Sequence, residues 1–403
     1  MKRGYRYRIY PDKEQQTLLE QHFGGTRFIY NRSLLIKNLM YSKFKINVSE
    51  IDLNNNLKLL KELHPWLKDL NSQSLQQANR NLLIGFKNFF EGNADYPTRK
   101  SKKDNNFSFQ IPQNYQINLT SSKIYLPKIG WMKIVLHRDF LDKEFIENEL
   151  VTKEVNGELI LDQKLNRKFD ILKTLTVSRT SAGRYHVSIL IDDHVPEPEP
   201  VEFDENTTMG IDVGIKSFAA LSSGEVIENP RFLKTSLDKL KKLQKEVSRK
   251  QKGSKNRRKA VLKLAKQHQL ISNQRNDFQH KVSMKIISES QAVVVEDLNV
   301  EGMVRNHCLA QSISDVGWSE FVNKLRYKAE WYGKTVLQIG RFEATSKLCN
   351  VCGYKKEDLT LDIRESECPD CKTLHDRDIN ASLNIKQIAL NNLSTAGTAG
   401  RAC

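Results

Sequence analysis

Hydrophobic and polar residues follow a helical period in the first part of this 403-residue chain. A short alternating stretch over residues 1–10 predicts a strand, and the apolar spacing over residues 12–92 predicts three or four helices. Breaks are expected at Gly24-Gly25, around Asn47 and at His64-Pro65, because glycine, asparagine and proline commonly interrupt helices.

The pattern changes to short alternating runs between residues 96 and 193, and these runs predict strands. Their spacing indicates a small barrel or sheet into which the helices of residues 12–92 are inserted. We therefore expect an α+β domain over residues 1–195, formed by a β-barrel with a helical insertion. Proline occupies every second position at the start of residues 196–207, which predicts an extended linker.

Strands and helices alternate after this linker. Two strongly apolar runs, residues 209–213 and 291–296, each contain one acid, and helical patterns follow them. Such alternation is typical of an α/β domain with a mixed sheet, expected over residues 208–345 and 373–392. Residues 393–403 are expected to form a disordered tail.

Positive charge is concentrated in one segment. The chain holds 64 Lys and Arg against 48 Asp and Glu, a net charge of +16, and residues 231–281 alone hold 17 basic and three acidic residues. Helical spacing on both sides of Gly253-Ser254 predicts an antiparallel hairpin with an apolar seam of Leu233, Leu237, Leu240, Leu243, Val247, Val261, Leu264, His268 and Ile271. Candidate contacts to a phosphate backbone are Lys241, Arg249, Arg257, Arg258 and Lys259. A solvated coiled-coil arm is the alternative, although such arms usually mix the two signs of charge.

The hydropathy of the chain and its N-terminal residues argue against a membrane protein or a secreted protein. No run of 18 apolar residues occurs, and the basic N-terminus has no apolar stretch behind it. Neither a membrane span nor a secretory signal is expected. A cytoplasmic protein with a polyanionic partner and no membrane partner fits these features.

Three acids stand in an informative order. Asp212 lies on an apolar strand, Glu296 ends another, and Asp378 begins a predicted helix. An acid in a buried strand is costly unless it is paired or binds a cation, and hard carboxylate oxygens suit Mg²⁺ or Mn²⁺. This order is typical of RNase H-like nucleases. For each acid taken alone, a helix cap or turn remains the alternative.

Four of the six cysteines form two CxxC pairs, Cys349 with Cys352 and Cys368 with Cys371. This spacing suits one tetrahedral Zn²⁺, and closed four-cysteine sites are structural. We expect a zinc ribbon over residues 346–372. The alternative is four unrelated reduced thiols.

The helix predicted over residues 72–90 presents Gln76, Asn79 and Arg80 on roughly one side. Amide and guanidinium groups suit contacts to base edges or backbone, and an ordinary polar helix face is the alternative. Arg27 is a further candidate, and so, with less support, are Tyr5, Lys100, Lys102 and Lys103.

With these residues in view, the chain resembles the TnpB (OrfB) family of transposon-encoded RNA-guided DNA endonucleases, similar to ancestors of type V CRISPR effectors. The resemblance covers nearly the whole chain. It rests on the double CxxC and on these motifs: Ile9-Tyr10-Pro11, Arg27-Phe28-Ile29-Tyr30-Asn31, Phe86-Lys87-Asn88-Phe89-Phe90, Gly210-Ile211-Asp212-Val213-Gly214, Glu296-Asp297-Leu298, Ser312-Ile313-Ser314-Asp315, Tyr327-Lys328-Ala329-Glu330-Trp331 and His375-Asp376-Arg377-Asp378.

The resemblance implies a RuvC-like nuclease domain with catalytic Asp212, Glu296 and Asp378, with Asp376 and Asn380 in support and the zinc ribbon inserted before the last acid. It also implies an N-terminal barrel that binds a guide RNA made from the transposon end and a short motif beside the DNA target. The host would be prokaryotic, with the protein at the nucleoid when bound to DNA. The acidic stretch over residues 139–164 departs from the family, and we expect it to be a solvent-facing loop.

Three other functions remain open. An RNA-guided repressor that does not cut would typically lack acids of the triad, and all three are present. A transposase that joins DNA ends would use the same acids or a tyrosine beside an HxH pair, which is absent. A zinc-ribbon DNA-binding regulator would leave the two strand-borne acids unexplained.

Overall fold

The computed structural model describes residues 1–105, 107–137, 152–163, 171–306, 309–341, 343–357 and 363–395. The chain forms two compact units, Met1–Val195 and Pro196–Cys403, each with its own sheet and its own core.

The first unit contains one nine-stranded antiparallel sheet in the order β2-β8-β9-β1-β5-β4-β3-β7-β6. Its strands are β1 (Lys2–Tyr10), β2 (Phe107–Ile111), β3 (Gln116–Asn118), β4 (Lys123–Leu126), β5 (Gly130–Val135), β6 (Thr152–Val155), β7 (Glu158–Asp162), β8 (Leu172–Arg179) and β9 (Tyr185–Asp192). Alternate residues of β9, such as Val187, Ile189 and Ile191, are buried in the core. The sequence therefore alternates as a sheet with one buried face requires.

The expected barrel is not found among the described residues. β2 and β6 are the two ends of the strand order, and they do not pair with each other. The helices α1 and α3 pack against β2. β6 and β7 also extend the sheet into the acidic stretch that we expected to be a loop, whereas residues 139–151 and 164 lie outside the described part of the chain.

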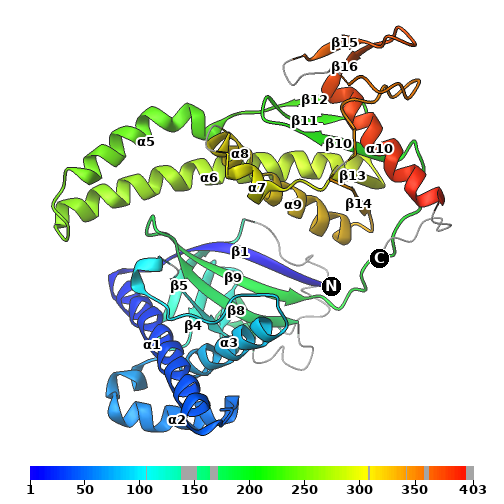
Figure 1. Cartoon of the computed structure of the whole chain (residues 1–403). Coiled ribbons are helices and arrows are strands. Elements are labelled where there is room, and N and C mark those ends of the chain that lie inside the picture. The colour runs from blue at the N-terminus through cyan, green and yellow to red at the C-terminus, as the bar shows by residue number, and fades with distance from the viewer. Residues whose placement is uncertain are drawn as a thin grey trace. The chain divides into compact units, whose positions relative to one another are not determined.

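Three helices follow β1: α1 (Lys13–Phe44), α2 (Glu50–Leu63) and α3 (Ser72–Phe90), with the short 3₁₀ helix η1 (Pro65–Asp69) between the last two. Figure 1 shows α1 and α3 packed together, and their apolar faces form a core with α2. The break predicted at Gly24-Gly25 is wrong, because α1 runs through both glycines. Gly25 serves packing instead: a Cβ there would lie 2.1 Å from Leu70 Cδ1.

The second unit is built on a five-stranded mixed sheet in the order β12-β11-β10-β13-β14. β10 (Thr208–Val213) pairs antiparallel with β11 (Ser217–Leu221) and parallel with β13 (Ala292–Glu296). β12 (Val226–Glu228) and β14 (Thr335–Ile339) form the two edges. β11 and β13 are almost wholly apolar and buried, as central strands covered on both faces are.

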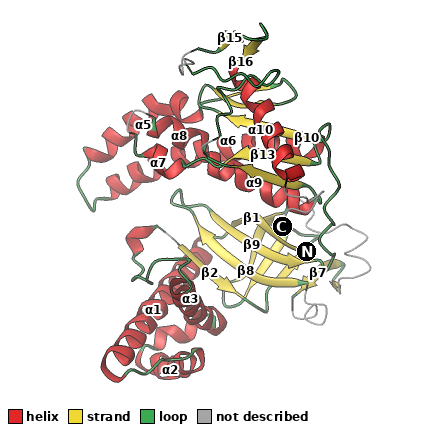
Figure 2. Cartoon of the chain, turned by 45° about the vertical axis from the view of Figure 1, so that its right-hand side comes forward, coloured by secondary structure: helices red, strands yellow, loops and turns green. Residues whose placement is uncertain are grey.

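Helices cover this sheet, as Figure 2 shows. α9 (Trp318–Trp331) packs on β14, and α10 (Arg377–Thr395) packs on β10, β11, β13 and β14. Gly210 permits the close approach of α10, because a Cβ at this position would lie 2.1 Å from the backbone oxygen of Ser382. The short helices α7 (Val300–Val304) and α8 (Ala310–Val316) complete the unit.

The basic segment forms the predicted hairpin, α5 (Phe232–Ser248) and α6 (Lys255–Glu289), which pack against each other. Its seam differs in part from the prediction. Leu240, Val247 and Ile271 are buried, but Val261 and His268 are exposed, and Ala260 and Gln267 take the inner positions one residue earlier.

The last segment contains the small hairpin β15 (Glu365–Glu367) and β16 (Leu374–Asp376), so the ribbon extends beyond the expected end at residue 372. The predicted tail is also too long, because α10 continues to Thr395 and no glycine or proline interrupts it before Gly397. Residues 396–403 lie outside the described chain. In the part of the chain that the structure describes, no helix is both long enough and apolar enough to cross a membrane.

Candidate functional site

Two of the three predicted acids lie at the ends of adjacent parallel strands. β10 and β13 pair in a register that sets Ile211 opposite Val295, so Asp212 and Glu296 are the next residues on neighbouring strands. Parallel strands end at the same edge of a sheet, and the sheet therefore brings these two carboxylates together.

The third acid, Asp378, lies in the first turn of α10. The Asp376 side chain begins this helix, since its Oδ1 accepts the backbone N–H groups of Asp378 (2.9 Å) and Ile379 (3.0 Å). The close approach of α10 to β10 at Gly210 then brings Asp378 to the same edge of the sheet.

Hydrogen bonds from neighbouring side chains hold two of the three carboxylates, those of Glu296 and Asp378. The Thr345 hydroxyl donates to Glu296 Oε1 (2.6 Å). Ser217 Oγ donates to Asp378 Oδ2 (3.4 Å), and Arg364 Nη1 donates to Asp378 Oδ1 (2.6 Å). No sequence motif marks Thr345, Ser217 or Arg364, so the sequence alone does not point to these contacts.

The Asp212 carboxyl lies in an unfavourable electrostatic environment. Its pKa is raised to about 8, first by burial and then by the like charges of Glu296 and Asp378; Arg377 and Arg364 partly oppose this rise. A carboxylate that burial and two like charges keep protonated becomes ionised when a divalent cation binds. In the described residues these three acids are more widely spaced than the four cysteines, whose ligand atoms all lie within 4.8 Å.

The four cysteines form one metal-sized cluster. Cys349 Sγ lies 3.6 Å from Cys371 Sγ, and Cys352 Sγ lies 3.6 Å from Cys368 Sγ. A tetrahedral zinc with Zn–S bonds of ~2.3 Å sets sulfur atoms about 3.8 Å apart, so the cluster is consistent with a structural zinc. His375 Nε2 lies 3.0 Å from Cys349 Sγ and adds a polar contact beside the cluster.

Two similar turns shape the cluster. The N–H of Gly353 donates to the Cys349 carbonyl, and the N–H of Lys372 donates to the Cys368 carbonyl. Both residues have positive φ, +75° at Gly353 and +61° at Lys372. A glycine therefore takes the left-handed conformation at the first pair, and at the second a lysine takes it.

α10 connects the cysteine cluster to the carboxylates. The Asn380 side chain accepts the N–H of Asn350 (3.0 Å) and donates to the Leu348 carbonyl (2.6 Å). One turn later, Asn384 donates to the carbonyls of Thr345 and Leu348 (both 2.7 Å). Asn380, which the resemblance placed in support of the acids, thus anchors the segment that leads into the first cysteine pair and that also carries Thr345.

The nucleic-acid candidates divide into three groups. Most are exposed on their helices: Gln76, Arg80, Lys241, Arg249, Arg258 and Lys259. Two are committed to the fold. Asn79 is fully buried and bonds to Ser33 and Asn54, so its assignment to a binding face is wrong. Arg257 Nη1 donates to the carbonyls of Val247 and Lys250 and closes the C-terminus of α5. Arg27 is half-buried and lines a pocket between α1 and α3.

The fold is that of an α+β protein whose mixed sheet carries three neighbouring acids, with a four-cysteine cluster inserted before the last of them. Models of known families match most of this chain. Residues 188–307 match OrfB_IS605, described as "Probable transposase", and residues 318–385 match the "Cas12f1-like, TNB domain". Residues 1–45 match a "Helix-turn-helix domain", although here they form strand β1 and the single helix α1.

Full-length relatives agree with these matches. A protein of Streptomyces pristinaespiralis named "Putative RNA-guided DNA endonuclease" is 35% identical over 100% of this chain and 91% of its own length. InsQ of Escherichia coli K12, which carries the same description, is 29% identical over 95% of this chain and 91% of its own length. The chain belongs to the OrfB/TnpB family.

Among solved structures, the mini-RNA-guided endonuclease CRISPR-Cas_phi3 has a similar fold. The TM-score is 0.50 at 10% identity, over 97% of this chain and 92% of that chain.

Proposed function

We propose that this protein is an RNA-guided, divalent-metal-dependent DNA endonuclease encoded by a transposon. The second unit would be its RuvC-like nuclease domain, of the RNase H-like fold, with Asp212, Glu296 and Asp378 as the ligands of Mg²⁺ or Mn²⁺. The names of the two bacterial relatives support the same activity.

The observation that carries the proposal is the meeting of three acids from distant parts of the sequence. The raised pKa of Asp212, caused by burial and by the other two carboxylates, is the electrostatic sign of an acid cluster at one site. Bound divalent ions would activate a water molecule and stabilise the leaving oxygen of a phosphodiester. The residues of this chain hold the ligands in place: Thr345 orients Glu296, and Asp376 and Gly210 set the start and the depth of α10.

The cysteine cluster would hold a structural Zn²⁺. Its four thiol sulfurs are a soft donor set that closes the coordination sphere, whereas the carboxylates offer hard oxygens. The two centres therefore select different metals, and only the carboxylate centre would take part in the reaction.

Nucleic acid would bind along the cationic surfaces. The hairpin of α5 and α6 exposes Lys241, Arg249, Arg258 and Lys259 for phosphate contacts. Gln76 and Arg80 on α3 remain candidates for contacts in the first unit, which we propose binds guide RNA and the motif adjacent to the target. Pairing between guide and target would then select the cut site.

The test begins with co-expression of the full chain and its native flanking DNA, followed by sequencing of the RNA that copurifies. One enriched RNA that ends in sequence next to the element supports guided function, and a bulk mixture of cellular RNA contradicts it. The purified complex is then given matched and mismatched DNA with and without Mg²⁺. Cleavage of the matched DNA alone, only with Mg²⁺, is the expected result.

Adjacent acids on one strand end provide a matched control. Glu296→Gln removes a proposed metal ligand, and it is expected to lower cleavage at least 100-fold. Asp297→Asn removes an exposed acid that pairs with Arg341 (2.8 Å), and its cleavage is expected to stay within about threefold of wild type. Full cutting by Asp212→Ala would disprove the site, and strand-transfer products in place of cut ends would establish a transposase.

A further inference from the structure

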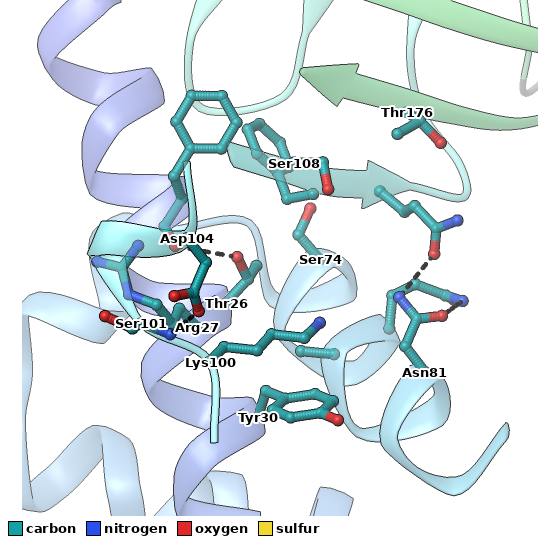
Figure 3. A pocket seen from close by; sticks show the side chains of 15 residues that line it. Thr26, Arg27, Tyr30, Ser74, Asn81, Lys100, Ser101, Asp104, Ser108 and Thr176 are labelled. Carbon is teal, nitrogen blue, oxygen red and sulfur yellow. Dashed lines mark hydrogen bonds between the residues drawn. The ribbon is translucent and has the colours of Figure 1, made fainter. Parts of the chain in front are cut away.

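A polar pocket lies inside the first unit, and none of the residues that line it belongs to the acid or cysteine cluster. It has a volume of about 210 Å³ and lies among α1, α3, β2, β8 and the short helix η2 (Lys102–Asp104). Figure 3 shows the side chains that line it, with Ser74 in its middle and Asn81 and Asp104 on opposite sides. None of the contacts described above explains why the fold leaves a pocket at this place.

The pocket contains a buried hydroxyl that has no partner. Ser74 is 1% exposed, and its Oγ makes no hydrogen bond among the described residues. Figure 3 shows this hydroxyl pointing toward Ser108 on β2. A buried polar atom without a partner costs about 1–3 kcal/mol, so the fold alone does not account for a serine here.

Amide side chains form one wall of the pocket. Gln77 Nε2 donates to Asn81 Oδ1 (3.3 Å), and Asn81 Nδ2 donates to Gln110 Oε1 (2.9 Å). This arrangement uses the Gln77 amide nitrogen and the Gln110 carbonyl oxygen within the chain. It leaves the Gln77 carbonyl oxygen as an acceptor and the Gln110 amide nitrogen as a donor, and such pairs match the edge of a nucleobase.

Cations stand at the rim. The Lys100 ammonium lies 4.0 Å from the centre of the Tyr30 ring, and burial lowers its pKa. Arg27 makes no ion pair with any described acid. Asp104 is engaged by the N–H of Ser101 (2.7 Å), so it caps its own turn. Two positive groups are thus available for a phosphate beside a neutral, hydrogen-bonding interior.

We propose that this pocket receives one unpaired nucleotide, with the base inside and its phosphate on Arg27 and Lys100. A cavity of about 150 Å³ holds a benzene ring, so about 210 Å³ accommodates a single base and excludes a base pair. The base would satisfy Ser74 and read the Gln77–Gln110 wall, as proteins read bases that are turned out of a stack. This inference rests on the proposed function, and the nucleotide could come from the guide RNA or from a DNA strand opened by it.

Photocrosslinking identifies the source. The Asp212→Ala complex, which is expected to bind without cutting, is assembled once with guide RNA containing 4-thiouridine and once with target DNA containing 4-thiothymidine. Mass spectrometry then locates the crosslinked peptides. Crosslinks from one labelled position to the peptides of Tyr30 or Phe109 are expected in one arm, and that arm names the source. Crosslinks elsewhere on the chain but none at the pocket in either arm overturn this inference alone, whereas absence of specific RNA overturns the proposed function as well.

Substitution separates a ligand role from a structural one. Ser74→Ala removes the hydroxyl without adding bulk, so the protein is expected to fold with equal or higher thermal stability because an unpartnered buried group is lost. Pocket crosslinking and affinity for the labelled strand are nevertheless expected to fall about three- to tenfold. The control, Ile84→Ala, lies on the same helix outside the pocket and is expected to change neither. Unchanged affinity and crosslinking in Ser74→Ala would show that the pocket holds only water.

Discussion

Replacing Asp212 by asparagine is expected to stabilise the metal-free protein, and more so as the pH rises. The pKa of this carboxyl moves from 3.8 to about 8 in the folded chain, so folding takes up a proton between these two values. The stability of the wild type therefore falls as the pH rises from about 4 to about 8. Asparagine carries no such proton, and the variant avoids this loss.

The magnitude follows from the shift. Four pKa units correspond to at most about 6 kcal/mol at pH 8. Water reaches part of the side chain and screens the repulsion, so we expect a difference of about 2 kcal/mol. At pH 5 most of this difference disappears, because the wild-type carboxyl is protonated in the folded state.

Urea unfolding of protein dialysed into Mg²⁺-free buffer, with its zinc retained, measures the effect at pH 5 and pH 8. Asp297→Asn is the control, because its acid is exposed and paired with Arg341. Added Mg²⁺ should stabilise the wild type at pH 8 and have little effect on Asp212→Asn. An equal difference between wild type and variant at both pH values, or equal stabilisation of both by Mg²⁺, would refute the argument from repulsion among the three acids.

Five further substitutions test other parts of the chain. Cys371→Ser is expected to lower both zinc content and cleavage through local unfolding around α10, as metal analysis beside a cleavage assay will show; full metal occupancy and activity would contradict it. Gly24→Ala should raise the free energy of unfolding by up to about 1 kcal/mol, because its Cβ meets nothing within 4 Å. Gly25→Ala should lower it by about 1–3 kcal/mol through the clash described above, and thermal unfolding of the pair checks the contrast. Arg258→Met should reduce the salt slope of nucleic-acid binding by about one without changing helicity, whereas Arg257→Met should loosen the end of α5, seen as faster amide exchange there.

The sequence was most informative where chemistry limits the residue type. Acids within apolar strands and paired cysteines have few structural uses, so Asp212, Glu296 and the four cysteines could be named from their positions alone. Their placement in the structure depends on short-range order: a strand end, a helix start and two tight turns.

Features that depend on distant partners could not be predicted in this way. The order of the nine strands depends on pairing between residues far apart in the chain. The alternating hydrophobic pattern therefore predicts strands, but it does not show whether the sheet closes into a barrel. Gly25 looks like a helix breaker until the buried Leu70 side chain is placed against it. Asn79 looks like a surface amide until Ser33 and Asn54 meet it in the core.

The dependence of Asp378 on its surroundings has a consequence during synthesis. Asp212 and Glu296 leave the ribosome long before α10, and the helix can be anchored only after the segment around Leu348 and both cysteine pairs have been made. A chain that stops short of α10 would keep its first unit and the basic hairpin but would lack the third carboxylate. Translation would thus produce the surfaces proposed to bind nucleic acid well before the set of ligands proposed to cut it, and on this proposal an interrupted chain would bind DNA without cutting it.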